Sequence, residues 1–250
     1  MRRDYFPGMQ LRAVAYEVQG AKIGVVPDIL EMTVTTPRGE TPTLSMSYAP
    51  GHNAIRGDVL EREVEVAVEA TFNGMDWEEL PDARFITQKT EHNLVNDGTD
   101  SRKVSAIHVS DYMKEALIWS VPIEAKDKDG KFKFLSRNAG TIIGTVWQNA
   151  VKRGWGAGLT LDANTTKDSS NQDWAKVVTL YFDPTISLLQ VVDSLRNLGM
   201  IDTVWQGRTF KVYNADTTQA RDLAASKRWP LATTLTGAPE AATWADMCTD

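Results

Sequence analysis

The clearest pattern in the chain is an alternation of apolar and acidic residues before Asn73. The apolar positions are Val64, Val66, Val68, Ala70 and Phe72, and the acidic positions between them are Glu63, Glu65 and Glu69. Successive side chains of a strand point to opposite faces, so this segment predicts a strand with one face in a core and the other in water. Asn73-Gly74 tolerates the positive φ of a hairpin turn, and residues 71–88 are therefore predicted to contain a β-hairpin.

The rest of the first half also consists of short strand-like segments separated by turns. Strand-like segments occupy residues 11–18, 29–36, 43–49 and 103–110, and a short helix in "DYMKEAL" is expected to begin with Ser110 or Asp111 as its cap. Many short strands separated by turn signals are typical of a barrel or a sandwich. Residues 1–123 are therefore predicted to form an antiparallel β-barrel-like or sandwich domain.

The pattern changes after a charged, glycine-containing segment at residues 124–131, which is predicted to be a linker. In "TIIGTVWQNAVKRG" one helical face carries apolar side chains, and Gly154 suits the left-handed residue that ends a helix. The residues of this face are Ile143, Val146, Trp147, Ala150 and Val151.

A second helix is predicted between Asp183, as N-cap, and Gly199, with Pro184 at its first position. Its apolar stripe consists of Leu188, Leu189, Val192 and Leu195. Two strands follow around the turn Gln206-Gly207. Residues 132–235 are therefore predicted to be a smaller α+β domain with two helices on one face of an antiparallel sheet. Residues 236–250 are predicted to be the start of a further segment that is truncated.

Composition narrows the class of protein. A hydrophobic share of 42% and a charged share of 24% are typical of a folded globular chain. The formal charge is -6 and the basic residues are scattered, which disfavours specific nucleic-acid binding. No apolar run approaches a membrane span and no signal peptide is present, so we expect a soluble chain made without export. The single cysteine, Cys248, allows no internal disulfide and indicates a reducing compartment of synthesis.

Histidines and carboxylates are the first candidates for catalytic or metal-binding residues. His52, His92 and His108 lie far apart and share no metal-ligand spacing, so solvated or core-edge histidines are the expected interpretation. Five acidic residues close together in the sequence could supply the paired carboxylates of a glycosidase. The alternation, however, explains three of them as the solvent-exposed face of a strand. The group consists of Asp58, Glu61, Glu63, Glu65 and Glu69.

Three loop motifs have simpler explanations. Asp162, Asn164, Thr166 and Asp173 match offsets 1, 3, 5 and 12 of a calcium loop, but Lys167 stands where glycine is needed and strands flank the segment, so a hairpin loop is favoured. The "GWGAG" at 154–158 follows a helix and is expected to be a cap and turn. The "RGD" at 56–58 is a chance match.

The chain has eight tryptophans, and exposed ones could stack on sugars. Trp147 falls on an apolar helix face and Trp205 beside a turn, which indicates burial or interface packing. No catalytic, cofactor-binding or metal-binding residue is predicted, no cofactor is expected, and we expect no enzyme.

The succession of segments resembles the minor tail proteins of long-tailed, siphovirus-type phages that infect actinobacteria, a tail-hub-like family. The segments are "LRAVAYEVQGAKIGVVPDILEMTVTTPRGETPTLSMSYAP", "EVEVAVE", "NGMDWEELPDARFI", "NAGTIIGTVWQNAVKRGWG", "DSSNQDWA" and "TISLLQVVDSLRNLGMIDTVWQGRTFKVYN". They cover nearly the whole chain in the same order, although each one is a structural pattern and none is a site.

This resemblance implies a structural protein of the virion tail tip, made in the host cytoplasm. It implies a homo-oligomer, expected to be a trimer, that contacts the distal tail protein or tail tube, the tape measure protein and other tail-tip proteins. Phage DNA would pass through its lumen without specific binding. The alternatives are a carbohydrate-binding host-recognition module and a tail-associated peptidoglycan hydrolase.

Overall fold

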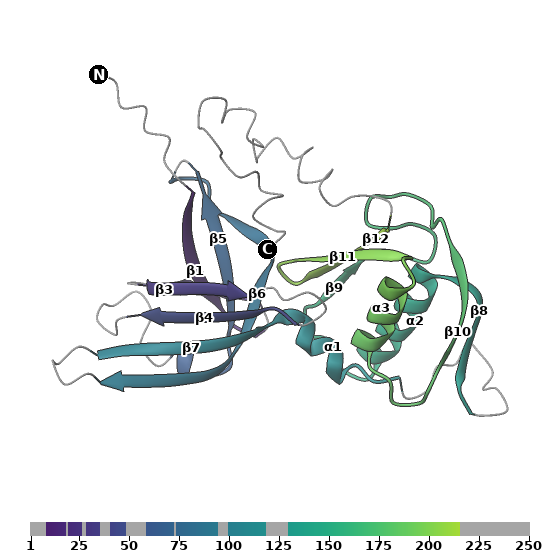
Figure 1. Ribbon diagram of the computed structural model, residues 1–250, viewed down its shortest axis with the longest axis horizontal. Coiled ribbons are helices and arrows are strands. Elements are labelled where there is room, and N and C mark those ends of the chain that lie inside the picture. Colours follow the sequence, from purple (N-terminus) through teal and green to yellow (C-terminus); the bar gives the residue numbers. More distant parts are fainter. Residues whose placement is uncertain are drawn as a thin grey trace, which may run out of the picture.

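The computed structural model describes residues 9–18, 20–26, 29–35, 41–48, 59–72, 74–94, 100–118 and 130–215. These residues form two units that lie side by side, a large sheet and a smaller group of helices and strands (Figure 1). The predicted strand-rich α+β class is confirmed. The predicted segment 236–250 and most of the predicted linker 124–131 lie outside the described residues, and strand β8 begins at Phe132.

The first unit is one seven-stranded antiparallel sheet with the order β2-β1-β5-β6-β7-β4-β3. Its strands are β1 (Gln10–Tyr16), β2 (Lys22–Val25), β3 (Ile29–Thr35), β4 (Thr43–Tyr48), β5 (Glu65–Thr71), β6 (Glu78–Leu94) and β7 (Asp100–His108), with the 3-10 turn η1 (Val59–Glu61) before β5. Strands β1 and β5 run steeply across the direction of β3, β4 and β7, so the sheet is strongly bent (Figure 1). The predicted barrel does not close in the part of the chain that the structure describes, because β2 and β3 lie at opposite edges and do not pair.

Strands β5 and β6 form the predicted hairpin, with Gly74 at a φ of 75° in the connecting loop. The register jumps from Glu69↔Glu79 to Ala67↔Arg84, so the residues between Glu79 and Arg84 bulge out of the ladder. Pro81, which has no N–H to give to a ladder, and Asp82, at a φ of 51°, both lie in this bulge. The bulge directs Asp82 toward the second unit.

The prediction that one face of the alternating strand is exposed to water is wrong. Glu65 is 0% exposed and Glu69 is 6% exposed, whereas Phe72, predicted to face the core, is 43% exposed. The valines of β5 do pack into the core of the first unit, together with Leu44, Met46 and Phe85. The period of two assigns side chains to faces, but it carries no information about what covers the second face, and here charged side chains and a distant hairpin cover it.

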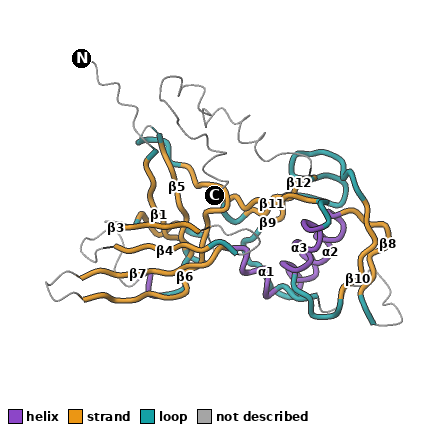
Figure 2. The backbone as a smooth tube through the Cα atoms, in the orientation of Figure 1, coloured by secondary structure: helices purple, strands orange, loops and turns teal. Residues whose placement is uncertain are grey.

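The second unit differs from the predicted single antiparallel sheet. Its elements are α1 (Tyr112–Glu115), β8 (Phe132–Asn138), α2 (Ala139–Lys152), β9 (Thr160–Asp162), β10 (Val177–Phe182), α3 (Leu188–Asn197), β11 (Ile201–Gln206) and β12 (Thr209–Asn214). The strands form two sheets, β10-β8 and β11-β12-β9, and β9 runs parallel to β12. Helices α2 and α3 lie between the two sheets (Figure 2). Apolar residues of both sheets reach these helices, so both faces of the helical layer are covered.

The two long helices confirm their predicted apolar faces with two corrections. Helix α3 begins at Leu188, not at Pro184, because Ser187 and Gln190 form a capping box. Val151, predicted on the apolar face of α2, is 44% exposed. Both predicted helix ends are confirmed, with Gly154 at a φ of 90° and Gly199 at a φ of 62°. No described helix combines the length and the apolar character that a membrane crossing requires.

The short helix α1 follows a second 3-10 turn, η2 (Val109–Asp111). Asp111 occupies the N-cap position of α1 as expected but makes no side-chain capping bond there. His108 instead caps η2, because its side chain accepts a hydrogen bond from the Ser110 N–H. Residues from Val109 to Ile118 pack into the core of the second unit, so the chain passes from one core to the other beside His108.

Candidate functional site

The two units meet along a buried polar contact, which we call the interdomain seam. Strands β5 and β6 of the first unit face strand β11 and the β11–β12 turn of the second. The seam consists of Glu65, Glu79, Asp82, Arg84, His108, Trp205 and Arg208.

Arg84 organises the side of the seam that belongs to the large sheet. Its Nε and Nη2 donate to the two carboxylate oxygens of Glu79 at 2.9 and 2.5 Å, and its Nη1 donates to Glu65 Oε2 at 3.2 Å. The guanidinium also lies 4.0 Å from the centre of the Tyr16 ring. The paired donors fix the planar group in one orientation, as bidentate arginine–carboxylate pairs do.

Arg208 enters the seam from the β11–β12 turn, where Gly207 has a φ of 58°. Its Nη1 lies 3.6 Å from Glu65 Oε1 and donates to the Val18 carbonyl of the first unit. Its Nη2 donates to the Ala157 carbonyl of the second unit at 2.6 Å. Because a single side chain holds backbone groups from both units, Arg208 ties the turn to the sheet.

Burial controls the electrostatics of Glu65. Removal from water raises the pKa of Glu65, while Arg208 and Arg84 oppose this shift. Its Oε1 is buried and forms no hydrogen bond in the structure. The carboxylate is therefore held by charge attraction from Arg208 and by one hydrogen bond from Arg84.

A second group of contacts surrounds the bulge. The backbone N–H of Trp205 donates to Asp82 Oδ1 at 2.7 Å, and this bond joins the two units directly. The His108 ring packs edge-on against Phe85 and Trp205, with centroids 5.8 and 6.4 Å apart. Burial lowers the pKa of His108 to about 4 and raises the pKa of Asp82 to about 6. The Asp82 side chain is 39% exposed and the His108 side chain 3% exposed. Water therefore stabilises the charged form of Asp82 more than the charged form of His108.

The described tryptophans are packed or hydrogen-bonded. Trp147 stacks on Phe210 at 6.1 Å and meets Trp155 edge-on at 5.1 Å, and Trp205 lies 5.0 Å from Phe210. Trp174 donates its indole N–H to the Asn164 carbonyl. Trp77 lies under the Arg12 guanidinium at 4.2 Å. The predicted burial of Trp147 and Trp205 is confirmed at 5% and 3% exposure.

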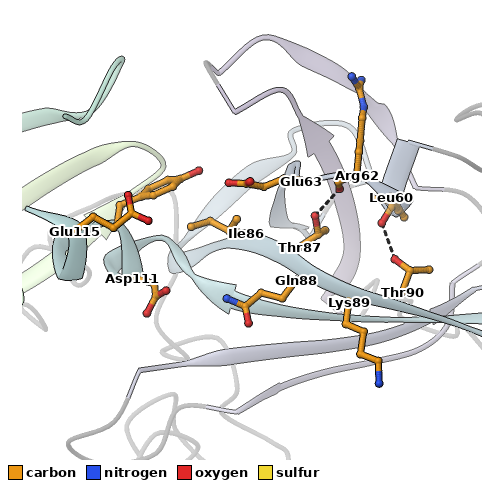
Figure 3. Close-up of a pocket in the computed structure, with 11 residues that line it drawn as sticks. Leu60, Arg62, Glu63, Ile86, Thr87, Gln88, Lys89, Thr90, Asp111 and Glu115 are labelled. Atoms are coloured by element: carbon orange, nitrogen blue, oxygen red, sulfur yellow. Dashed lines mark hydrogen bonds between the residues drawn. The ribbon is translucent and has the colours of Figure 1, made fainter. Parts of the chain in front are cut away.

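A hollow of about 410 Å³ opens between β6 and α1 (Figure 3). Ile86 and Tyr112 supply apolar surface, and Glu63 and Glu115 supply carboxylates. Arg62 and Lys89 line it but point away from the other labelled side chains in Figure 3. The hollow is open and polar and brings together no nucleophile, base and orienting group.

The structure does not bring the candidate carboxylates together in an open cleft. Glu65 pairs with Arg84 and Arg208, whereas Glu69 pairs with Arg12 at 2.6 Å and with Lys22 at 4.0 Å. Glu63 is exposed at the hollow. His92 is exposed on β6. His52, Asp58, the Glu61 side chain and the "RGD" lie outside the described residues.

The calcium-like segment is organised by a residue that the motif did not include. Asp168 is 4% exposed and accepts bonds from the N–H groups of Ser170 and Gln172 and from the backbone and side-chain amides of Asn214. Lys167 pairs with Asp173 across a β-bridge, as a hairpin loop requires. Among the described residues, no cluster of three or more acidic, histidine or cysteine side chains could hold a metal ion.

Sequence reasoning missed the seam itself. No sequence motif includes Arg84, Arg208 or Asp82. Asp82 and Trp205 are 123 positions apart, and a contact over such a distance leaves no local pattern in the sequence. One local signal was present, because Pro81-Asp82 interrupts a strand pattern and predicts a bulge.

No family model and no curated protein sequence matches this chain. Solved structures with a similar fold include prophage tail protein gp18 from Listeria monocytogenes EGD-e, with a TM-score of 0.47, 11% identity and coverage of 80% of this chain. The tail protein from Neisseria meningitidis MC58 gives a TM-score of 0.45, 10% identity and 81% coverage. A half-lidded Francisella PdpA-VgrG complex gives a TM-score of 0.45, 8% identity and 87% coverage.

This chain spans 50% of the length of each of the two tail proteins and 33% of the matched chain in the Francisella complex. These structural neighbours are a prophage tail protein, a second tail protein and a component of a PdpA-VgrG complex. At TM-scores below 0.5, the similarity assigns neither a family nor a function to the chain.

Proposed function

We propose that this chain is a structural minor tail protein of a siphovirus-type phage virion. In this role several copies, expected to be three, form a tail-tip hub or adaptor ring between the tail tube or distal tail protein and the tip apparatus, and phage DNA passes through the opening during ejection. The proposal includes no catalytic role. It rests on the sequence resemblance and on one observation, the two edges of the large sheet that stay unpaired among the described residues.

Strand β3 at one edge leaves part of the core-side face uncovered. Met32 and Val34 lie opposite Met46 and Leu44, so they point to the same face as these core residues, yet Val34 is 40% exposed. Leu30, in the adjoining bulge, is 61% exposed. An open apolar edge invites pairing with another strand, and a ring of subunits would cover it at every copy. Strand β2 forms the opposite edge among the described residues.

The alternatives are less well supported. A carbohydrate-binding module needs exposed, coplanar tryptophans, whereas the described ones are partly or fully buried in packing contacts. A peptidoglycan hydrolase needs two convergent carboxylates in a cleft that a polysaccharide can enter. Glu65 and Glu79 do converge on Arg84, but Glu65 is 0% exposed beneath the β11–β12 turn.

The test is the oligomeric state of the purified chain and of two variants of strand β3. Native mass spectrometry and electron microscopy are expected to show closed rings for the wild type. Val34→Lys places a charge on the half-covered apolar face and is expected to weaken association. Thr33→Lys is the matched control, since Thr33 is exposed on the opposite face. A folded wild type that remains monomeric, equal effects of both variants, or hydrolysis of cell walls by the purified chain would contradict the proposal.

A further inference from the structure

His108 occupies the only position in the described chain where backbone passes from the large sheet to the second unit. It is the last residue of β7, and Ala106 two positions earlier packs into the first core. Val109, the next residue, packs into the second core. The backbone N–H of His108 donates to the Pro42 carbonyl at 2.9 Å, which anchors the residue to the sheet.

The hydrogen bonds of His108 define its tautomer. The backbone N–H of Ser110 donates to Nδ1 at 3.3 Å, and the Ser110 Oγ lies 2.9 Å from the same nitrogen. Because Nδ1 accepts from a backbone amide, it carries no hydrogen, and the hydrogen of the neutral ring is on Nε2. Nδ1 is therefore the cap of η2, the turn that begins the second unit.

The surroundings of the ring are apolar except for one carboxylate, which attracts a protonated ring and is therefore removed in the experiment below. Phe85 from β6 and Trp205 from β11 pack on the ring, and Nε2 is buried without a hydrogen-bond partner. The charged group facing it is Asp82 on β6, whose Oδ1 lies 3.9 Å from Nε2 and also accepts the Trp205 N–H. The positive charge of Arg196 on α3 favours the charged form of Asp82.

We propose that His108 is an acid-sensitive hinge, in which protonation of Nδ1 removes the cap of η2, places a charge in the seam and separates the two units. Two consequences of one proton act together. The acceptor that held the Ser110 N–H becomes a donor, and the ring between Phe85 and Trp205 gains a charge that water would stabilise better. Opening of the seam exposes His108 to water while each unit keeps its own core.

The expected size follows from linkage. Burial lowers the pKa of His108 from 6.5 to about 4, so the closed form binds its proton less readily than the open form. At pH 5 this difference favours opening by about 30-fold relative to neutral pH. Asp82 acts in the opposite direction, because burial raises its pKa to about 6 and closing then favours its protonated form. In the wild type the two effects partly cancel, and removing Asp82 is expected to reveal the full effect of His108.

The experiment measures opening at the bond that joins the units. The amide of Trp205 exchanges with solvent hydrogen only when its bond to Asp82 breaks, and Trp147 within α2 reports on the stability of the second unit by itself. Both amides can be followed by NMR in one sample labelled with ¹⁵N-tryptophan. Protection factors, corrected for the intrinsic pH dependence of exchange, are measured at pH 7.5 and pH 5 for two variants. These are Asp82→Asn, which keeps an acceptor for Trp205, and Asp82→Asn with His108→Asn.

Asparagine at position 108 is a good cap residue that does not titrate, and its Oδ1 can take the place of Nδ1. For Asp82→Asn alone we expect protection at Trp205 to fall by about 30-fold at pH 5, while protection at Trp147 is unchanged. In the double variant we expect no fall at Trp205. An equal fall in the double variant, an equal fall at Trp147, or no fall in Asp82→Asn would each overturn the proposal.

Discussion

The guanidinium of Arg208 lies 3.6 Å from the carboxylate of Glu65, although the two residues belong to different units and Glu65 is 0% exposed. This contact explains why a strand that alternates between valine and glutamate is buried on both faces. One face of β5 packs into the first core, and the other is covered by charged side chains whose partners include the turn between β11 and β12.

Arg208→Ala is expected to destabilise the protein by about 2 to 3 kcal/mol, because it leaves Glu65 buried with Arg84 as its one remaining partner. Urea unfolding monitored by circular dichroism measures the change in the free energy of unfolding. Arg62→Ala is the matched control, since Arg62 pairs with Glu17 at the surface, with side chains 55% and 43% exposed, and its loss is expected to cost less than about 0.5 kcal/mol. If both variants lost the same free energy of unfolding, the buried pair would contribute no more to stability than the surface pair.

Asp82→Ala and Asp82→Asn are expected to differ strongly at neutral pH. Alanine removes the acceptor of the Trp205 N–H and adopts the φ of 51° poorly, so we expect a loss of about 2 to 4 kcal/mol. Asparagine keeps an oxygen at the same position, tolerates a left-handed backbone and carries no charge to desolvate, so a loss of no more than about 0.5 kcal/mol is expected at pH 7.5. Thermal and chemical unfolding of both variants would measure the contrast, which vanishes if the bond to Trp205 is unimportant.

The stability of the wild type relative to Asp82→Asn is expected to depend on pH. The pKa of Asp82 is raised to about 6 in the folded protein from 3.8, so the folded state binds the proton more readily than the unfolded state. The resulting stabilisation is fully present below pH 3.8 and is lost as pH rises through about 6. Unfolding curves of both proteins from pH 4 to pH 7.5 should show the wild type gaining relative stability toward acid. A gain toward alkaline pH would contradict the shift.

Ser187→Ala is expected to destabilise the protein by about 1 kcal/mol, whereas Asp183→Ala should cost less than about 0.5 kcal/mol. The Gln190 N–H donates a hydrogen bond to Ser187 Oγ, which caps α3, and the Ser187 N–H donates one to Gln190 Oε1. Asp183, the cap expected from sequence, makes one exposed ion pair with Lys131. Equilibrium unfolding of the two variants distinguishes the alternatives, and the reverse order of costs would place the start of the helix at Pro184.

Two glycines of α2 are expected to respond in opposite ways to alanine. A Cβ on Gly140 would collide with the Asn164 carbonyl and the Trp174 indole, so Gly140→Ala is expected to cost about 1 to 3 kcal/mol. A Cβ on Gly144 meets nothing within 4 Å, so Gly144→Ala is expected to stabilise the helix by about 0.5 to 1 kcal/mol. Melting temperatures of the two variants provide the measurement. Destabilisation by both would show that the packing around α2 is tighter than the structure indicates.

Local patterns in the sequence determined the elements whose signals are local. The β5–β6 hairpin follows from alternation and Asn73-Gly74, and the ends of α2 and α3 follow from Gly154 and Gly199, because each signal acts within a few residues. Helix α3 begins at Leu188 and not at Pro184, since Asp183-Pro184 and Ser187 both have the residue types of a helix start and only the capping bonds decide between them.

Tertiary structure alone decided three features: the edges of the large sheet that stay unpaired among the described residues, the splitting of the second unit into two sheets, and the seam. The alternation places Glu65 on the face opposite the valines, whether water or Arg208 covers that face. The sequence therefore predicts on which face Glu65 lies, but not that Arg208 covers it. His108 likewise carries no local sign of its position between two cores. The physical reason is that burial and pairing of a charge depend on groups brought close by folding. Some of these groups stand more than a hundred positions apart in the chain, as Asp82 and Trp205 do.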